Sequence, residues 1–372
     1  MSGQQTELRV SSLELFFDLV FVFTITQLTA LVEHHTSLKS IGSAAVIFVV
    51  MYWMYSAYVW LTNRVPPNSN FRKLLLVAGM SSFLTCALAI PKAFEQNSLA
   101  FAIGYAMVVI VHSTLYIQVH GTKVWRFVPF NLLGAACLVG AAFTKGWLQY
   151  AFWLAPIALH LVTSALASRV DESESSSFNI QAGHFVERHG LLLLITFGES
   201  IIAVGIGLSG MTLTLMVYSA AVLGLILVAA LWWCYFSADE ARAEHRMKAA
   251  PLTERVRLAL HGYFYSYMLI LFGIVILSAG LHHALSYISN TLPVEQALLL
   301  GAGVALFFLG TVAFKKTFGI QPLGTRIIAS LAALLTCFAG TMISALAQIG
   351  LLIMVVVGCL IVEAKAESTA DK

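Results

Sequence analysis

Long apolar segments dominate this sequence and follow one another with short polar breaks. A helix needs about 20 mostly apolar residues to cross the hydrocarbon core of a bilayer. The chain is 59% hydrophobic and 10% charged, whereas soluble domains hold roughly 45–50% apolar and 25% charged residues. A water-soluble fold could not bury this much apolar surface, so we expect an all-α polytopic membrane protein.

About twelve transmembrane helices are predicted. They cover roughly residues 13–32, 41–61, 71–90, 99–118, 126–143, 147–167, 185–207, 212–236, 260–281, 295–314, 325–343 and 346–363. A turn is expected near Gly340 to Gln348, and the sequence leaves open whether 325–363 forms two spans or one broken helix.

The spans divide into two six-helix halves. We predict an N-terminal cytoplasmic segment (1–12), a first repeat (13–167), a cytoplasmic linker (168–184), a second repeat (185–363) and a cytoplasmic tail (364–372). A charged helix on the membrane surface is expected within Ala238 to Arg257.

Basic residues set the orientation, because Lys and Arg concentrate in short cytoplasmic loops. With the N-terminus inside, 18 of the 21 basic residues fall on the cytoplasmic side, and the other three are Lys39, Lys92 and Lys145. Both termini are therefore predicted to be cytoplasmic. The polar start of the chain leads straight into a span, so no removable signal peptide is predicted.

The two halves share features in the same order. Phe16-Phe17-Asp18 in the first span corresponds to Phe197-Gly198-Glu199 in the seventh, and aromatic clusters follow about 35 residues later in each half. Arg126 precedes Cys137 by the same eleven residues that separate Arg326 from Cys337. Because six spans is an even number, we expect parallel repeats, and repeats of this kind in transporters place the binding site at their interface.

Acidic residues inside the apolar spans are the leading candidates for function. Glu14 and Asp18 are four residues apart and share one helix face, and Glu199 lies deep in the seventh span beside Ser200. A charge at the centre of a bilayer costs about 2.5–3.5 kcal/mol on insertion scales, so such residues face the bundle interior and often mark an ion or proton path. The alternative is that an arginine pairs with each acid and only fixes helix packing.

Other polar residues could serve the same path. His112 and His160 lie within spans and are candidates for passing protons, with neutral core histidines as the alternative. A last group consists of candidate gate or structural ion pairs: Glu187, Arg188, His189, Arg126 and Arg326. The spacing of His184, Glu187 and His189 misses a metal motif by one residue. We therefore predict no metal, no cofactor and no catalytic set, and an enzyme is the less favoured class.

Two segments resemble a known family. The first is Glu14-Leu15-Phe16-Phe17-Asp18-Leu19-Val20-Phe21-Val22-Phe23, and the second joins Glu187-Arg188-His189-Gly190 to Phe197-Gly198-Glu199-Ser200. Together they resemble the two signatures of the bacterial low-temperature-requirement A (LtrA) family. The resemblance covers the whole chain, and it implies a protein of the bacterial cell (inner) membrane with a link to growth in the cold.

A second similarity is to the endolysosomal potassium-channel family with two six-helix repeats. Its first helix carries Arg-x-x-x-Phe-Ser-Asp, whereas Phe17 stands here in place of the Ser and Arg9 lies too far upstream. This similarity implies only the architecture and that the first helix of each half lines the central axis.

We therefore expect a transporter or channel for protons, a monovalent cation or a small solute, with Asp18 and Glu199 lining the path between the repeats. The alternatives are an intramembrane lipid-modifying enzyme and a non-transporting adaptor linked to cold growth. The expected partners are membrane lipids and an unidentified ion or solute, with a homo-oligomer left open. The net charge of +3 gives no case for nucleic acid.

Overall fold

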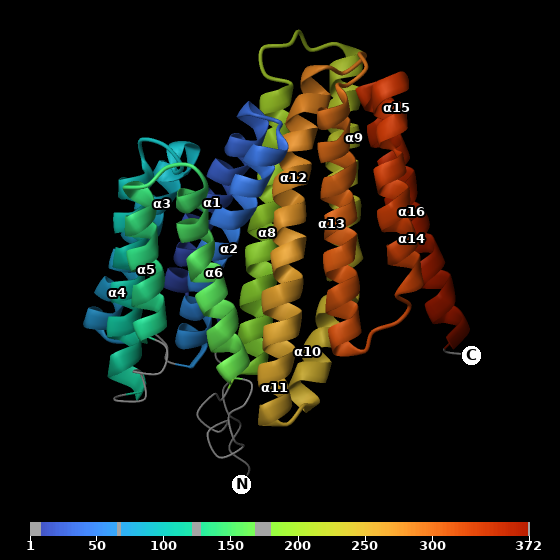
Figure 1. Cartoon of the computed structure of the whole chain (residues 1–372). Coiled ribbons are helices and arrows are strands. Elements are labelled where there is room, and N and C mark those ends of the chain that lie inside the picture. The colour runs from blue at the N-terminus through green and yellow to red at the C-terminus, as the bar shows by residue number, and fades with distance from the viewer. Residues whose placement is uncertain (1–8, 65–67, 121–127, 168–179, 371–372) are drawn as a thin grey trace. The chain divides into compact units, whose positions relative to one another are not determined.

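The protein is all-helical. The computed structural model describes residues 9–64, 68–120, 128–167 and 180–370, and within them every regular element is a helix (Figure 1). The predicted spans of the first half correspond to α1 (Ser12–His34), α2 (Leu38–Arg64), α3 (Asn70–Ala89), α4 (Ser98–His120), α5 (Val128–Ala142) and α6 (Trp147–Ala167). Those of the second half correspond to α8 (Ala182–Gly207), α9 (Leu215–Phe236), α12 (Tyr267–Ser286), α13 (Val294–Phe318), α14 (Gly324–Leu335) with α15 (Cys337–Met342), and α16 (Ala345–Ala370).

The helices have the length and composition of membrane spans. Among the described residues, ten helical stretches are long and apolar enough to cross a bilayer, and α5 is a shorter apolar helix. The helix α6 fills the remaining predicted position with 21 residues. The prediction of a polytopic membrane protein with about twelve membrane helices is therefore confirmed.

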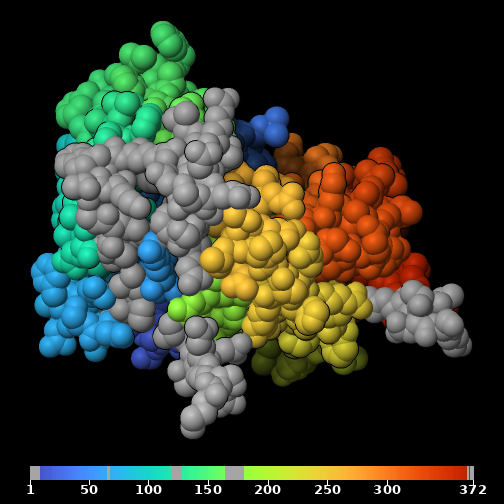
Figure 2. Space-filling model, turned by 90° about the horizontal axis from the view of Figure 1, so that it is seen from below, coloured from blue at the N-terminus to red at the C-terminus, as the bar shows by residue number. Residues whose placement is uncertain are grey.

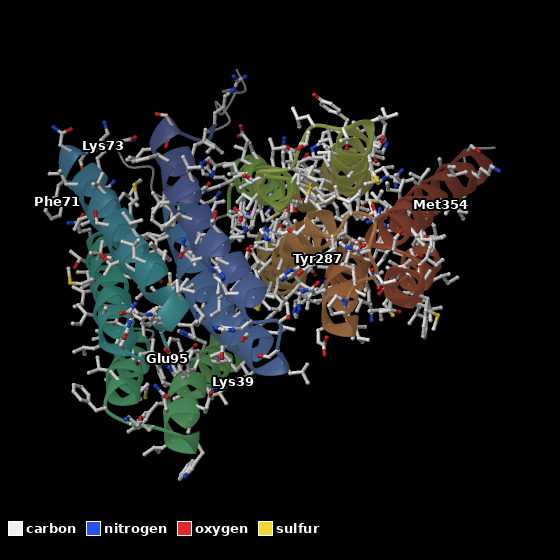
Figure 3. The ribbon with its side chains drawn as sticks, turned by 90° about the horizontal axis from the view of Figure 1, so that it is seen from above. Lys39, Phe71, Lys73, Glu95, Tyr287 and Met354 are labelled. Atoms are coloured by element: carbon white, nitrogen blue, oxygen red, sulfur yellow. The ribbon has the colours of Figure 1, made fainter. Side chains whose placement is uncertain are left out.

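Large apolar side chains also point outward from the helices. Phe71 on α3 and Met354 on α16, which are labelled in Figure 3, are 55% and 62% exposed. Large exposed apolar patches on a soluble protein are rare and mark a binding surface. Here such side chains occur on many helices, as expected where lipid tails are the solvent.

Short helices follow the long ones at several points. The charged helix expected between Ala238 and Arg257 is α10 (Asp239–Ala249), which is visible at the end of the molecule seen from below (Figure 2). It is followed by α11 (Leu252–Leu258) and by a π-helical stretch, η3 (Ala259–Ser266), that leads into α12. A single 3₁₀ turn, η1 (Ile90–Lys92), ends α3.

The chain packs into two compact units that interleave along the sequence. Unit 1 holds Met1–Leu31, Gly42–Arg188 and Pro251–Val256, and unit 2 holds Val32–Ile41, His189–Ala250 and Arg257–Lys372. In unit 1, α4 packs against both α3 and α5, and α5 packs against α6. The proposed linker at 168–184 lies largely outside the described residues, so the division into two repeats stays a prediction.

Glycines bring α12 and α13 close together in unit 2. A Cβ added to Gly280 would lie 2.6 Å from the backbone nitrogen of Leu300, and one added to Gly273 would lie 2.7 Å from that of Phe307. Contacts of this length with a backbone atom cannot form without moving a helix. Small residues at such positions let membrane helices approach closely and gain van der Waals contact.

A buried ionic network joins five elements of unit 2. Arg326 on α14 binds Asp239 of α10 (Nη1–Oδ2 2.6 Å), and its Nε and Nη2 donate to the Glu363 carboxylate of α16 at 3.0 and 2.9 Å. Lys315 on α13 donates to Glu363 Oε1 at 2.9 Å, and Arg326 Nη2 also donates to the carbonyl oxygen of Cys234 at 2.9 Å. Two acids here face two bases, so the network is electrically balanced.

The same network answers the question left open for 325–363. Arg326 and Thr325 lie at the start of α14, and Glu363 lies near the end of α16, yet the Thr325 hydroxyl donates to Glu363 Oε1 at 3.1 Å. The two helices are therefore antiparallel neighbours with a turn between Met342 and Ala345. This stretch is two spans rather than one broken helix.

The close approach of α12 and α13 gives a test of the packing. We predict that Gly280→Ala lowers the free energy of unfolding by about 1–3 kcal/mol, because the added methyl group overpacks a backbone contact. Thermal unfolding of the purified protein in detergent measures this. The matched control is Gly350→Ala on α16, where a Cβ meets no atom within 4 Å. Equal unfolding temperatures for wild type and Gly280→Ala would contradict the packing.

Candidate functional site

The first helix begins with a capping box that places Glu14. Ser11 precedes α1, and its hydroxyl accepts a hydrogen bond from the Glu14 backbone N–H at 3.3 Å. In return, Glu14 Oε2 accepts from the backbone N–H of Ser11 at 3.0 Å and from its hydroxyl at 2.8 Å. This reciprocal pattern is the Ser-x-x-Glu capping box, which satisfies backbone donors at a helix start. It also fixes the carboxylate of Glu14 in one position.

Two acids on α1 face two basic side chains on α8. Glu14 and Asp18 are one turn apart on their helix, as are His184 and Arg188 on theirs. His184 Nε2 lies 3.3 Å from Glu14 Oε2, and Arg188 Nη2 lies 2.9 Å from Asp18 Oδ1. The lower-numbered acid, Glu14, meets the lower-numbered base, His184, and the higher-numbered acid meets the higher-numbered base. The helices α1 and α8 therefore run parallel here. Parallel spans have an odd number of spans between them, and the predicted spans between α1 and α8 are the five from α2 to α6.

The guanidinium of Arg188 is bound on every nitrogen. Its Nε lies 3.2 Å from both carboxylate oxygens of Asp18, and its Nη1 donates to Glu14 Oε1 at 3.2 Å and to the hydroxyl of Thr62. The same group lies over the ring of Phe17, 5.8 Å from the centroid. A planar fork of donors suits such paired carboxylates, and aromatic faces attract the cation. Arg188 therefore holds both acids of α1 at once.

The helix α2 supplies the remaining polar contacts. The hydroxyl of Tyr55 donates to Asp18 Oδ1 at 2.8 Å, and Thr62 lies seven residues further along the same face. Asn63 follows, with its Nδ2 3.1 Å from His184 Nδ1 and 3.1 Å from the carbonyl oxygen of Gln181. Its Oδ1 accepts from the Gln181 backbone N–H at 3.0 Å. Residues of unit 1 from three helices, α1, α2 and the start of α8, thus contribute to one site.

The site is removed from solvent. Asp18 is 0% exposed, Arg188 1%, Glu14 2% and His184 5%. Burying an ionised group without a partner is far more costly than burying a neutral one, so buried charges are paired. We call Glu14, Asp18, His184 and Arg188 the α1–α8 cluster. It joins two carboxylates to one guanidinium and to one imidazole that carries charge only when protonated.

The two predicted histidines of the first half pack against aromatic rings in unit 1. His112 lies edge-on to Tyr58, with ring centroids 5.1 Å apart. His160 stacks on Trp53 at 4.3 Å, and its Nε2 lies 3.4 Å from the hydroxyl oxygen of Tyr105. Both are buried, and their part in an ion path stays a prediction.

The predicted ion-pair residues have different surroundings. The backbone N–H of Val10 donates to Glu187 Oε2 at 3.4 Å, so Glu187 holds the chain that leads into α1. Arg126 lies outside the described residues. Arg326 pairs with Asp239 and Glu363 in unit 2, two acids that the sequence did not single out.

The predicted residues further along the seventh span, His189, Glu199 and Ser200, lie in unit 2. Glu199 is 4% exposed, and the hydroxyl of Ser200 shares a hydrogen bond of 2.8 Å with that of Ser278 on α12. His189 packs against the rings of Tyr263 and Tyr267, with centroids 4.9 and 5.3 Å away. Whether Glu199 and Ser200 line a path stays a prediction.

Sequence reasoning found the two acids and Arg188 but missed their other partners. His184, Tyr55, Thr62 and Asn63 were not proposed for the site. His184 had a usable signal, because it precedes Arg188 by the same four residues that separate Glu14 from Asp18. The α2 residues had none, because the apolar pattern of that helix does not show which face meets α1.

The fold and the cluster define a multi-pass helical membrane protein with a buried ionic site where α1, α2 and α8 meet. Residues 9–363 match the profile of the bacterial low temperature requirement A protein (LtrA). The chain belongs to this family, as its two signatures predicted. It is also similar to an uncharacterized protein, RA0937, of Rhizobium meliloti (strain 1021), at 24% identity over 314 residues, 82% of this chain and 76% of that protein. No solved structure matches the chain.

Removing the guanidinium tests the electrostatics of the α1–α8 cluster. We predict that Arg188→Gln destabilises the protein by about 3–5 kcal/mol, because it leaves two buried carboxylates without a cation. The triple variant Glu14→Gln, Asp18→Asn, Arg188→Gln should recover part of this loss. Unfolding in mixed micelles measures both, with the exposed Lys73→Gln as control. A triple variant no more stable than Arg188→Gln would contradict the charge argument.

Proposed function

We propose that this protein is a transporter or channel that moves protons, alone or together with a monovalent cation or small solute, and that the Glu14–His184 pair is its proton site. The observation that carries the proposal is the charge count of the α1–α8 cluster. Two carboxylates face one guanidinium, so the cluster is one proton short of neutrality. Binding one proton would make this buried cluster electrically neutral, and burial favours the neutral state.

The network around Arg326 supports this interpretation by contrast. It is equally buried, yet its two acids are matched by Lys315 and Arg326. Such a balanced network has no need of a further proton and is suited to holding helices together. The α1–α8 cluster differs because its fourth member is a histidine, which, unlike a lysine, can be neutral near neutral pH.

Within the cluster, the Asp18–Arg188 and Glu14–His184 pairs have different roles. Asp18 is bound by two guanidinium nitrogens and by the hydroxyl of Tyr55. We assign it the structural role of fixing the arginine between α1 and α8. Glu14 receives a single guanidinium contact and lies near the start of α1. It is the acid better placed to exchange a proton with an aqueous face.

The orientation forms part of the proposal. The distribution of basic residues favours cytoplasmic termini, which would place Glu14 near the cytoplasmic face of a bacterial inner membrane. Impermeant labelling of single cysteines introduced into the two tails tests this orientation. We also propose that the architecture consists of two parallel six-helix repeats, as the sequence predicts.

A liposome assay tests the function directly. We predict that the purified protein, reconstituted with a trapped pH-sensitive dye, dissipates an imposed proton gradient. Glu14→Gln and His184→Gln should abolish this flux, because the first removes the carboxylate that takes the proton and the second removes the imidazole that binds this carboxylate.

The control is Glu244→Gln, which removes an exposed carboxylate whose partner is Lys248 on the same helix. It should retain the flux of the wild type. The proposal is wrong if the wild-type protein moves no protons under any cation gradient tested. The assignment of the site is wrong if flux occurs but survives in both Glu14→Gln and His184→Gln.

A further inference from the structure

The side-chain amide of Asn63 can adopt only one orientation in this structure. Its Oδ1 lies 3.0 Å from the backbone nitrogen of Gln181, and its Nδ2 lies 3.1 Å from the carbonyl oxygen of the same residue. A backbone N–H can only donate, and a backbone carbonyl can only accept. Exchanging the two amide atoms would place donor against donor and acceptor against acceptor. Gln181 therefore fixes which end of Asn63 faces His184.

The fixed amide determines the protonation of His184. The atom of Asn63 that lies 3.1 Å from His184 Nδ1 is Nδ2, which carries only hydrogens and cannot accept. His184 Nδ1 must then accept this hydrogen bond, so it holds no proton. The proton of the ring lies on Nε2, which donates to Glu14 Oε2 at 3.3 Å. His184 is a neutral imidazole in this arrangement.

A second ring proton is opposed by its surroundings. On Nδ1 it would point at the N–H of Asn63, and relieving that clash requires the amide to leave both bonds to Gln181. Glu14 on α1 contacts His184 directly, and Arg188 lies one turn along α8 with Asp18 bound to its guanidinium. Arg255 of α11 reaches the nearby carbonyl of Ile180 at 3.5 Å.

We infer that Asn63 is a positioning residue that selects Glu14 as the proton acceptor of the α1–α8 cluster, by holding His184 neutral with its proton on Nε2. This inference rests on the proposed function for its purpose, although the state of His184 can be measured without it. The incoming proton adds to the Glu14 carboxylate and forms a neutral acid. His184 keeps its single proton, and the Asp18–Arg188 pair keeps its balance of charge.

This role separates Asn63 from a residue that only packs. The isosteric substitution Asn63→Asp replaces the donor facing Nδ1 by an acceptor and adds a negative charge. The ring should then take a second proton on Nδ1, and the cluster should hold its proton on the imidazole. A structural role alone predicts no such change in the chemistry of the ring.

Nitrogen NMR of the full-length protein in lipid bilayers tests the inference. The protein is labelled with ¹⁵N-histidine, and His184 is assigned from the signal that His184→Gln removes. We expect the wild type to show a neutral ring with an unprotonated Nδ1 and a protonated Nε2, at neutral pH. In Asn63→Asp we expect both nitrogens of His184 to be protonated.

The control is Asn97→Asp, which adds the same charge at the turn between α3 and α4 and should leave the His184 signals as in the wild type. A wild-type His184 that is doubly protonated, or that carries its proton on Nδ1, overturns the inference whether or not Asn63→Asp folds. An unchanged ring in a folded Asn63→Asp also overturns it. Because the spectrum requires no flux, failure of transport and failure of this assignment are distinguishable.

Discussion

Charge neutralisation within a hydrocarbon solvent is the constraint on which this structure depends. Ionised side chains are costly in the membrane interior and are kept only where partners surround them. Among the described residues, the α1–α8 cluster of unit 1 and the Arg326 network of unit 2 both meet this requirement. In each, an arginine binds two acids that come from other turns or other helices, and these ion pairs hold the helices together.

The two networks differ in how the charge is completed. Around Arg326, a lysine supplies the second cation, and both acids have a permanently charged partner. Around Arg188, the corresponding place is taken by His184, whose charge depends on its protonation. Replacing a buried ion pair by apolar residues is often neutral or stabilising, so such groups are weak evidence for stability alone. We propose that the cluster that lacks one permanent cation binds and releases a proton.

Much of the fold was predictable from the sequence, because a bilayer leaves the chain few choices. Each apolar stretch of sufficient length must form a helix whose backbone satisfies its own hydrogen bonds, so the spans could be placed within a few residues. The turn between 325–343 and 346–363 was the weak point. Its antiparallel geometry became evident only from the contact of Thr325 and Arg326 with Glu363.

The candidate site was predictable only in part. Acids within apolar spans are conspicuous, and so Glu14 and Asp18 could be singled out. Their partners depend on which faces of α1, α2 and α8 meet, and the all-round hydrophobicity of membrane helices does not encode those faces. Nothing in the sequence distinguishes Tyr55 and Asn63 from other polar residues. They take part in the site because the fold places them beside Asp18 and His184.

The central claim is that the α1–α8 cluster binds one proton and that Glu14 carries it. Infrared difference spectroscopy of the protein in bilayers, recorded as the pH is stepped down, reports the appearance of protonated carboxyl groups. The account predicts a carboxylic acid band that Glu14→Gln removes and that Glu199→Gln leaves in place. A band that is unchanged in Glu14→Gln, or no band from a buried carboxyl group at all, would contradict it.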